Sequence, residues 1–186
     1  MTKDPPNPIT MLDLIVSSLR FHPALIVSAE VRDAAAWEAA NAGQTGHTIL
    51  TAFHADNAFD AYRRLVSMCH SAQTGLSDAH LLEMCAGAWP IMVFKKQLKD
   101  NSRKYMEIFE ATGVENGRLQ GRMLYRFVIR ETERDEHGRV IKVHGSHQRV
   151  GTISPELFCR LRDNGAPEAE LYRLFPNVNE KEAQMP

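Results

Sequence analysis

Apolar residues recur at helical spacing near the start of the chain, directly after a polar, proline-rich opening. The residues of this pattern are Leu12, Ile15, Val16 and Leu19. Their i, i+3, i+4, i+7 spacing is typical of one face of an amphipathic helix. Thr10 has the side chain of an N-cap, and Asp13 follows it as the partner in a capping box. We therefore predict a helix that begins after Thr10 and ends before Pro23.

Two uncharged apolar runs, residues 24–29 and 48–53, flank an alanine-rich segment, residues 33–43. Uncharged runs of this length are typical of strands that are buried on both faces of a sheet. The alanine-rich segment predicts a helix, which we expect to open on Asp33 as its cap and to close on Gly43. Strand, helix and strand together predict two parallel strands joined by a right-handed crossover.

The pattern changes at about residue 88. Before it, residues 57–70 and a segment capped by Ser77 have helical periodicity. After it, four β-rich segments separated by turn sequences predict an antiparallel meander, followed by two helices. The four segments are residues 89–98, 103–112, 118–130 and 139–150, and the two helices are expected after Ser154 and over residues 167–175. We expect an α/β protein with two regions, residues 1–88 and residues 89–186.

Composition narrows the possible functions only slightly. The 186 residues include 22 basic and 23 acidic side chains, and the net charge of −1 gives no electrostatic argument for nucleic acid or an acidic membrane surface. The three cysteines form no CxxC pair, which favours free thiols in a reducing compartment. No apolar run approaches the roughly 20 residues that span a bilayer, and no signal peptide is visible. These features predict a cytoplasmic protein.

The candidate functional residues lie where the two predicted parallel strands end. The first run leads into Glu30, and the second leads into His54. The carboxyl ends of parallel strands share one edge of a sheet, where ligands of α/β proteins bind. We therefore expect a carboxylate and an imidazole to face one crevice. Each residue also has a simpler interpretation: Glu30 as a solvated residue or a partner of Arg32, and His54 as a histidine bonded to a loop carbonyl.

Basic residues gather in the first predicted hairpin of the β-rich region. They are Lys95, Lys96, Lys99, Arg103 and Lys104. A solvated hairpin is the simple interpretation, and a docking surface for a membrane-platform partner is the alternative.

Short motifs in residues 10–57 occur in an order that is similar to a known family. The motifs are Thr10-x-x-Asp13-Leu14, Leu19-Arg20-x-x-Pro23, Glu30-Val31-Arg32-Asp33, Thr45-Gly46-His47 and Phe53-His54-Ala55-Asp56-Asn57. With this order and spacing, the sequence closely resembles the C-terminal half of the secretion-superfamily ATPases of type II and type IV secretion, pili and tight-adherence systems. The run into Glu30 resembles the Walker B segment, and the stretch around His47 and His54 resembles the histidine box. The later β-rich stretch resembles the tight-adherence branch.

The resemblance implies a role for each matching residue. Glu30 matches the Walker B glutamate, which orients the attacking water and supports Mg²⁺ indirectly through water. His54 matches the histidine that senses the γ-phosphate, and His47 matches the histidine at the entrance of the box. Arg32 and Asp33 match the end of the motif after the glutamate, and we expect them to support the nucleotide site together with His47.

Two departures from the family pattern bear on activity. Ala29 stands where the family usually has glycine, and the sequence G-x-x-x-x-G-K-[ST] is absent because the chain has no Gly-Lys pair. That loop supplies the backbone N–H groups and the lysine that hold the β- and γ-phosphates. We therefore expect a fragment, a partial RecA-like (P-loop NTPase) domain with a β-rich C-terminal region, which binds nucleotide weakly or not at all by itself.

The resemblance also implies cofactors and partners. The intact family member uses ATP and Mg²⁺ to drive protein or DNA transport or pilus assembly. It works as a hexameric ring in the cytoplasm, held at the inner membrane by a platform protein, and no direct nucleic-acid binding is expected. One alternative is a non-catalytic structural or regulatory subunit that docks into a related motor ring. Another is a chain that completes an ATPase site in trans with a separate P-loop chain or with the missing N-terminal half.

Overall fold

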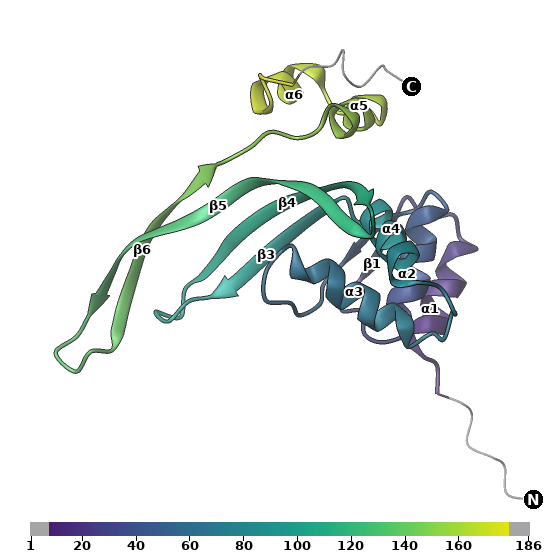
Figure 1. Cartoon of the computed structure of the whole chain (residues 1–186), viewed down its shortest axis with the longest axis horizontal. Helices are drawn as coiled ribbons and strands as arrows, with labels where there is room; N and C mark the ends of the chain where they lie inside the picture. The colour runs from purple at the N-terminus through teal and green to yellow at the C-terminus, as the bar shows by residue number, and fades with distance from the viewer. Residues whose placement is uncertain (1–7, 179–186) are drawn as a thin grey trace, which may run out of the picture. The chain divides into compact units, whose positions relative to one another are not determined.

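A computed structural model describes residues 8–178 of the chain (Figure 1). The elements are α1 (Met11–Leu19), β1 (Leu25–Ser28), α2 (Ala35–Gln44), β2 (Thr48–Thr51), α3 (Asp60–His70), α4 (Asp78–Ala88), β3 (Ile91–Gln97), β4 (Arg103–Glu115), β5 (Arg118–Arg134), β6 (Val140–Arg149), α5 (Pro155–Asp163) and α6 (Glu168–Leu174). They form two compact units. Among the described residues, the first unit contains residues 8–56, Asp60–Trp89 and Val114–Leu119, and the second contains Asn57–Phe59, Pro90–Gly113 and residues 120–178.

The first unit contains the predicted strand–helix–strand element. β1 and β2 pair in parallel, with Leu25 opposite Thr48 and Ser28 opposite Thr51. A further hydrogen bond, from the Val31 N–H to the Ala52 carbonyl at 3.0 Å, continues the contact beyond both strands. The mixed α/β class and the parallel pairing are therefore confirmed.

One face of this small sheet is exposed, so the prediction that both faces are buried was wrong. Ile26 and Ile49 are buried, but the alternate residues are not. The side chains of Leu25, Val27 and Leu50 are 48%, 63% and 58% exposed. Successive strand residues point to opposite faces, and only the face bearing Ile26 and Ile49 is covered. An uncharged run is compatible with a strand that is covered on both faces. It does not show whether the covering elements belong to the same chain.

The ends of α2 also differ from the prediction. Asp33 does not cap the helix: its φ of 47° lies in the left-handed region, and the N-cap is Ala34, which makes no side-chain capping bond. The helix continues through Gly43, where a β-carbon would meet the Ala88 β-carbon at 2.7 Å. Gly43 therefore allows close approach to the end of α4, and Gly46, with φ of 93°, reverses the chain after the helix.

The starts of α1 and α4 follow the predicted caps, whereas α3 starts at Asp60, three residues after the predicted Asn57. The Thr10 side chain accepts a hydrogen bond from the Asp13 N–H in a complete capping box, and Ser77 accepts one from the His80 N–H. Helices α3 and α4 then pack through a buried interface. In it, the free thiols of Cys69 and Cys85 lie 3.9 Å apart.

The second unit is built on a four-stranded antiparallel sheet in the order β3-β4-β5-β6, so the predicted meander is confirmed. Both closing helices are also present, and Ser154 caps α5 as expected, with Pro155 in the first turn. A small core joins the sheet to these helices. Its buried residues are Leu124, Ile153, Phe158 and Leu171.

Asp100, in the turn between β3 and β4, binds a strand that is distant in the sheet order. Its carboxylate accepts hydrogen bonds from the Ser102 hydroxyl at 2.7 Å and from the Val143 N–H of β6 at 2.8 Å. The hydrogen bond from the Ser102 side chain, followed by that from the Val143 backbone, holds the pKa of Asp100 below its ordinary value of 3.8. The carboxylate therefore links the turn to the outer strand β6.

The Asp100→Asn variant is expected to have a lower urea midpoint than the parent chain at neutral pH. A carboxyl group whose pKa is lowered by folding contributes stability above its unfolded value, and that contribution disappears as the pH falls through the lower folded value. The difference between the two proteins should therefore shrink as the pH falls below 3.8. Urea unfolding at a series of pH values measures it. A constant difference across the series would contradict this role of the carboxylate.

Candidate functional site

Glu30 lies two residues beyond the end of β1, at the carboxyl edge of the parallel sheet. Its side chain is 37% exposed. The Arg32 guanidinium donates from Nε to Glu30 Oε1 at 2.9 Å, and Arg32 Nη2 lies 2.9 Å from the same oxygen. Val31, between them, is fully buried and anchors the segment. The simpler interpretation of Glu30 as a partner of Arg32 is therefore confirmed, and this pairing fixes one carboxylate oxygen.

His54 lies three residues beyond the end of β2, at the same edge. Its Nε2 is 3.8 Å from Glu30 Oε1, and its side chain is 94% exposed. Parallel strands in register bring their carboxyl ends together, which explains how residues 24 positions apart in the chain become neighbours. The predicted acid and imidazole thus lie side by side and open to solvent.

The other two predicted site residues are placed differently. His47 directly precedes β2, so it lies at the amino end of the strand whose carboxyl end leads to His54. Its Nδ1 is 3.4 Å from the Thr45 hydroxyl. Asp33 follows Arg32 in the loop after Glu30 and is exposed. The structure therefore groups Glu30, Arg32 and His54, leaves Asp33 beside them in the loop, and separates His47 from them by the length of β2.

This arrangement leaves one side of the carboxylate available. Nε and Nη2 of Arg32 and the imidazole of His54 approach Oε1 of Glu30. Within residues 8–178, no protein group forms a hydrogen bond with Oε2. A carboxylate held at one oxygen and open at the other can orient a water molecule, and an adjacent imidazole can donate to an anionic oxygen.

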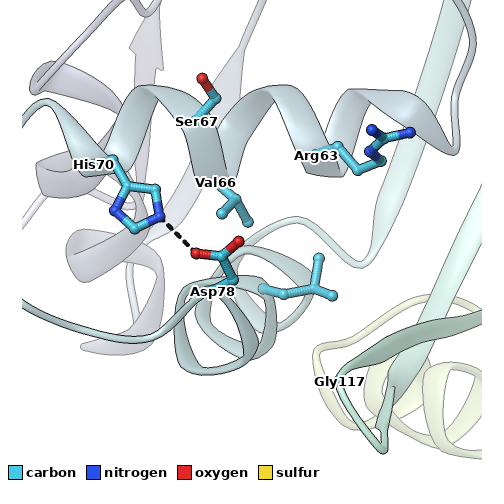
Figure 2. A pocket seen from close by; sticks show the side chains of 7 residues that line it. Arg63, Val66, Ser67, His70, Asp78 and Gly117 are labelled. Carbon is cyan, nitrogen blue, oxygen red and sulfur yellow. Dashed lines mark hydrogen bonds and ion pairs between the residues drawn. The ribbon is translucent and has the colours of Figure 1, made fainter.

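A separate surface hollow of about 540 Å³ lies in the first unit, away from the predicted site residues (Figure 2). Its walls come from α3, the start of α4 and the turn before β5. His70 ends α3, and its Nε2 is 2.8 Å from Asp78 Oδ1 in the first turn of α4. Arg63, also on α3, lies at the opposite side of the hollow from His70. None of the site residues predicted from the sequence lines this hollow.

Among residues 8–178, no three His, Cys, Asp or Glu side chains cluster in a way that could hold a metal ion. None of the helices in the same range has the length and apolar character needed to cross a membrane.

Comparison with known proteins gives a family match over most of the chain. Residues 4–169 match the family described as "Type II/IV secretion system protein". Protein VirB11 of Agrobacterium fabrum is 32% identical over 88 residues, which cover 46% of this chain and 26% of VirB11. The uncharacterized protein MJ0900 of Methanocaldococcus jannaschii is 40% identical over 57 residues, covering 31% of this chain and 10% of that protein. The matched regions thus span about a quarter or less of these relatives.

Proposed function

Because the chain belongs to the type II/IV secretion system protein family, we propose that it supplies one part of the nucleotide site of a secretion-system ATPase. In this proposal, the first unit is the C-terminal part of a RecA-like core, and its activity is coupled to protein or DNA transport or to pilus assembly. The observation that carries the proposal is the placement of Glu30 and His54, 3.8 Å apart at the carboxyl edge of two parallel strands.

The residues at this edge fit one side of a magnesium–triphosphate group. In intact members of the family, bound ATP supplies the phosphoanhydride bond that is cleaved, and Mg²⁺ neutralises its charge. Glu30 would orient a water through Oε2, with which no described protein group forms a hydrogen bond. It would act on Mg²⁺ only through water. Arg32 would hold the carboxylate in place through Oε1. His54, 94% exposed, would donate to a phosphate oxygen. Asp33 would support the site from the adjoining loop, whereas His47, at the amino end of β2, would take no part in it.

The phosphate cradle has to come from outside the residues that make this edge, because the chain contains no Gly-Lys pair. The exposed apolar face of β1 and β2 supports such completion. Parallel sheets are normally covered on both faces, and Leu25, Val27 and Leu50 leave one face uncovered. We propose that a P-loop-bearing half, in the same polypeptide or in a separate chain, covers this face and completes the domain.

The completed domain is proposed to work as a homo-oligomeric ring, with a hexamer as the family habit. We place it in the cytoplasm, peripheral to the inner membrane, where a platform protein of the transport system holds it.

The absent cradle also favours a second candidate function. A non-catalytic subunit that docks into a related motor ring would keep Glu30 and His54 without using them. Such a subunit would use the same exposed apolar face for docking but would never bind nucleotide at this edge.

Nucleotide titration separates the two candidates. We expect a non-hydrolysable ATP analogue with Mg²⁺ to show weak or no binding to the chain alone, because the edge supplies no phosphate cradle. Binding should appear when a P-loop-bearing N-terminal half from the same family is added. Isothermal titration calorimetry, with and without that half, measures both states. Association of the two halves without any nucleotide binding would reject the ATPase proposal and support the docking subunit.

A further inference from the structure

The turn end of the β3–β4 hairpin carries an unusual concentration of positive charge. Five basic side chains lie within residues 95–104, which we call the basic hairpin (Figure 1). They are Lys95, Lys96, Lys99, Arg103 and Lys104, and all of them except the half-buried Lys104 are exposed. The chain as a whole carries a net charge of −1, so this local excess is hidden in the overall balance.

The strand register places like charges directly opposite each other in the basic hairpin. Lys96 pairs with Lys104, and the next pair toward the turn is Gln97 with Arg103. Like charges at opposed positions of an antiparallel pair are destabilising. The segment has one acidic residue, Asp100, whose carboxylate is engaged by Ser102 and by the Val143 N–H.

No compensating acid is found in the rest of the described chain. Within residues 8–178, no carboxylate lies within ion-pair distance of any lysine or arginine of the basic hairpin. Lys104 instead lies with Nζ 5.8 Å from the centre of the Phe127 ring. The repulsion is therefore not relieved by any carboxylate among residues 8–178, and a negatively charged surface outside the chain would relieve it.

The side chains around these charges indicate the kind of surface. Four of the five cations are lysines, whose flexible point charges suit a diffuse anionic field better than the fixed two-pronged contacts that arginine makes. Tyr105, which pairs with Lys95, is 56% exposed, and Val93 in the same hairpin is 48% exposed. A lysine beside an exposed aromatic and an aliphatic side chain matches a lipid headgroup layer, in which the charge meets phosphates and the apolar parts enter the interface.

We propose that the basic hairpin binds the anionic lipid headgroups of a membrane surface. This contact is direct, so it differs from attachment through a platform protein, and it does not depend on the nucleotide site. It gives a structural reason for keeping a like-charge strand pair that costs stability in the free protein. The attraction should weaken as salt is added, because it acts between solvent-exposed charges.

Vesicle binding by the full chain tests the proposal. Wild type should co-sediment with vesicles of phosphatidylcholine mixed with phosphatidylglycerol, and much less with pure phosphatidylcholine. The triple variant Lys95→Gln, Lys96→Gln, Lys99→Gln should lose at least tenfold in partitioning to the mixed vesicles, since each basic residue near an anionic surface contributes to binding. Its urea midpoint should be equal or higher, because the repulsion between residues 96 and 104 is relieved.

A second triple variant is the matched control: Arg122→Gln, Arg126→Gln, Arg130→Gln. These arginines are exposed on β5, and their replacement removes the same amount of charge. This variant should bind mixed vesicles within about twofold of wild type, since its charges lie outside the basic hairpin. Equal losses in both variants would reduce the effect to net charge and overturn the proposal. Failure of wild type to bind mixed vesicles would overturn it too, as would tighter, hairpin-dependent binding to duplex DNA.

Discussion

ATP turnover by the completed site is expected to fall by about two to four orders of magnitude when Glu30 is replaced with glutamine, the range typical of a lost acid–base group. The amide keeps the size of the carboxylate and can still accept a hydrogen bond from Arg32 at Oε1. It removes the negative charge that would orient a water through Oε2. The substitution therefore separates the chemistry of the residue from its packing.

Association of the two halves should survive this substitution. Glu30 lies in the loop beyond β1, whereas the proposed contact uses the exposed face bearing Leu25, Val27 and Leu50. Phosphate release by the mixture measures turnover, and analytical ultracentrifugation measures association. Glu83→Gln is the matched control, because Glu83 is an exposed carboxylate on α4 outside the edge. A Glu30→Gln mixture that hydrolyses ATP as fast as the parent mixture would show that the assigned role of Glu30 is wrong.

Several elements were predictable because their signals are local. A hydroxyl residue followed by a helical apolar pattern located the starts of three helices, at Thr10, Ser77 and Ser154. The parallel pairing of β1 and β2 followed from the short helical crossover between them, and it also brought Glu30 and His54 together. These inferences depend on a few adjacent residues or on chain connectivity.

Other features of the structure depend on information that the pattern of hydrophobic and polar residues does not contain. One face of β1 and β2 is exposed because no described element packs against it. The residues of a strand do not show which elements will pack beside it. The left-handed backbone at Asp33 is a property of one loop, and a capping residue type could not reveal it. His47 was grouped with His54 by motif, although their order around β2 already implied opposite ends of the strand.

The buried carboxylate of Glu110 is the clearest feature that had no sequence signal. Glu110 is 1% exposed in β4, and Ser154, 44 positions later, is 3% exposed. The Ser154 N–H donates to Glu110 Oε2 at 2.8 Å, and the Ser154 hydroxyl donates to Oε1. The same hydroxyl accepts from the Leu157 N–H at 3.1 Å and so caps α5. An acid in a strand of mixed polarity would normally be assigned to the solvent face, and only the distant helix start explains its burial.

Replacing Glu110 with alanine should lower the free energy of unfolding by about 3 kcal/mol, because two buried donors of Ser154 lose their acceptor and a cavity remains. Glu110→Gln keeps the shape and one acceptor, so it should cost about half as much. Urea unfolding measures both, and hydrogen exchange should show α5 opening first, since Phe158 follows this cap into the core. Glu115→Ala, at an exposed position of β4, should change stability by less than about 0.5 kcal/mol. Equal urea midpoints for Glu110→Ala and Glu115→Ala would show that Glu110 does not hold α5 on the sheet.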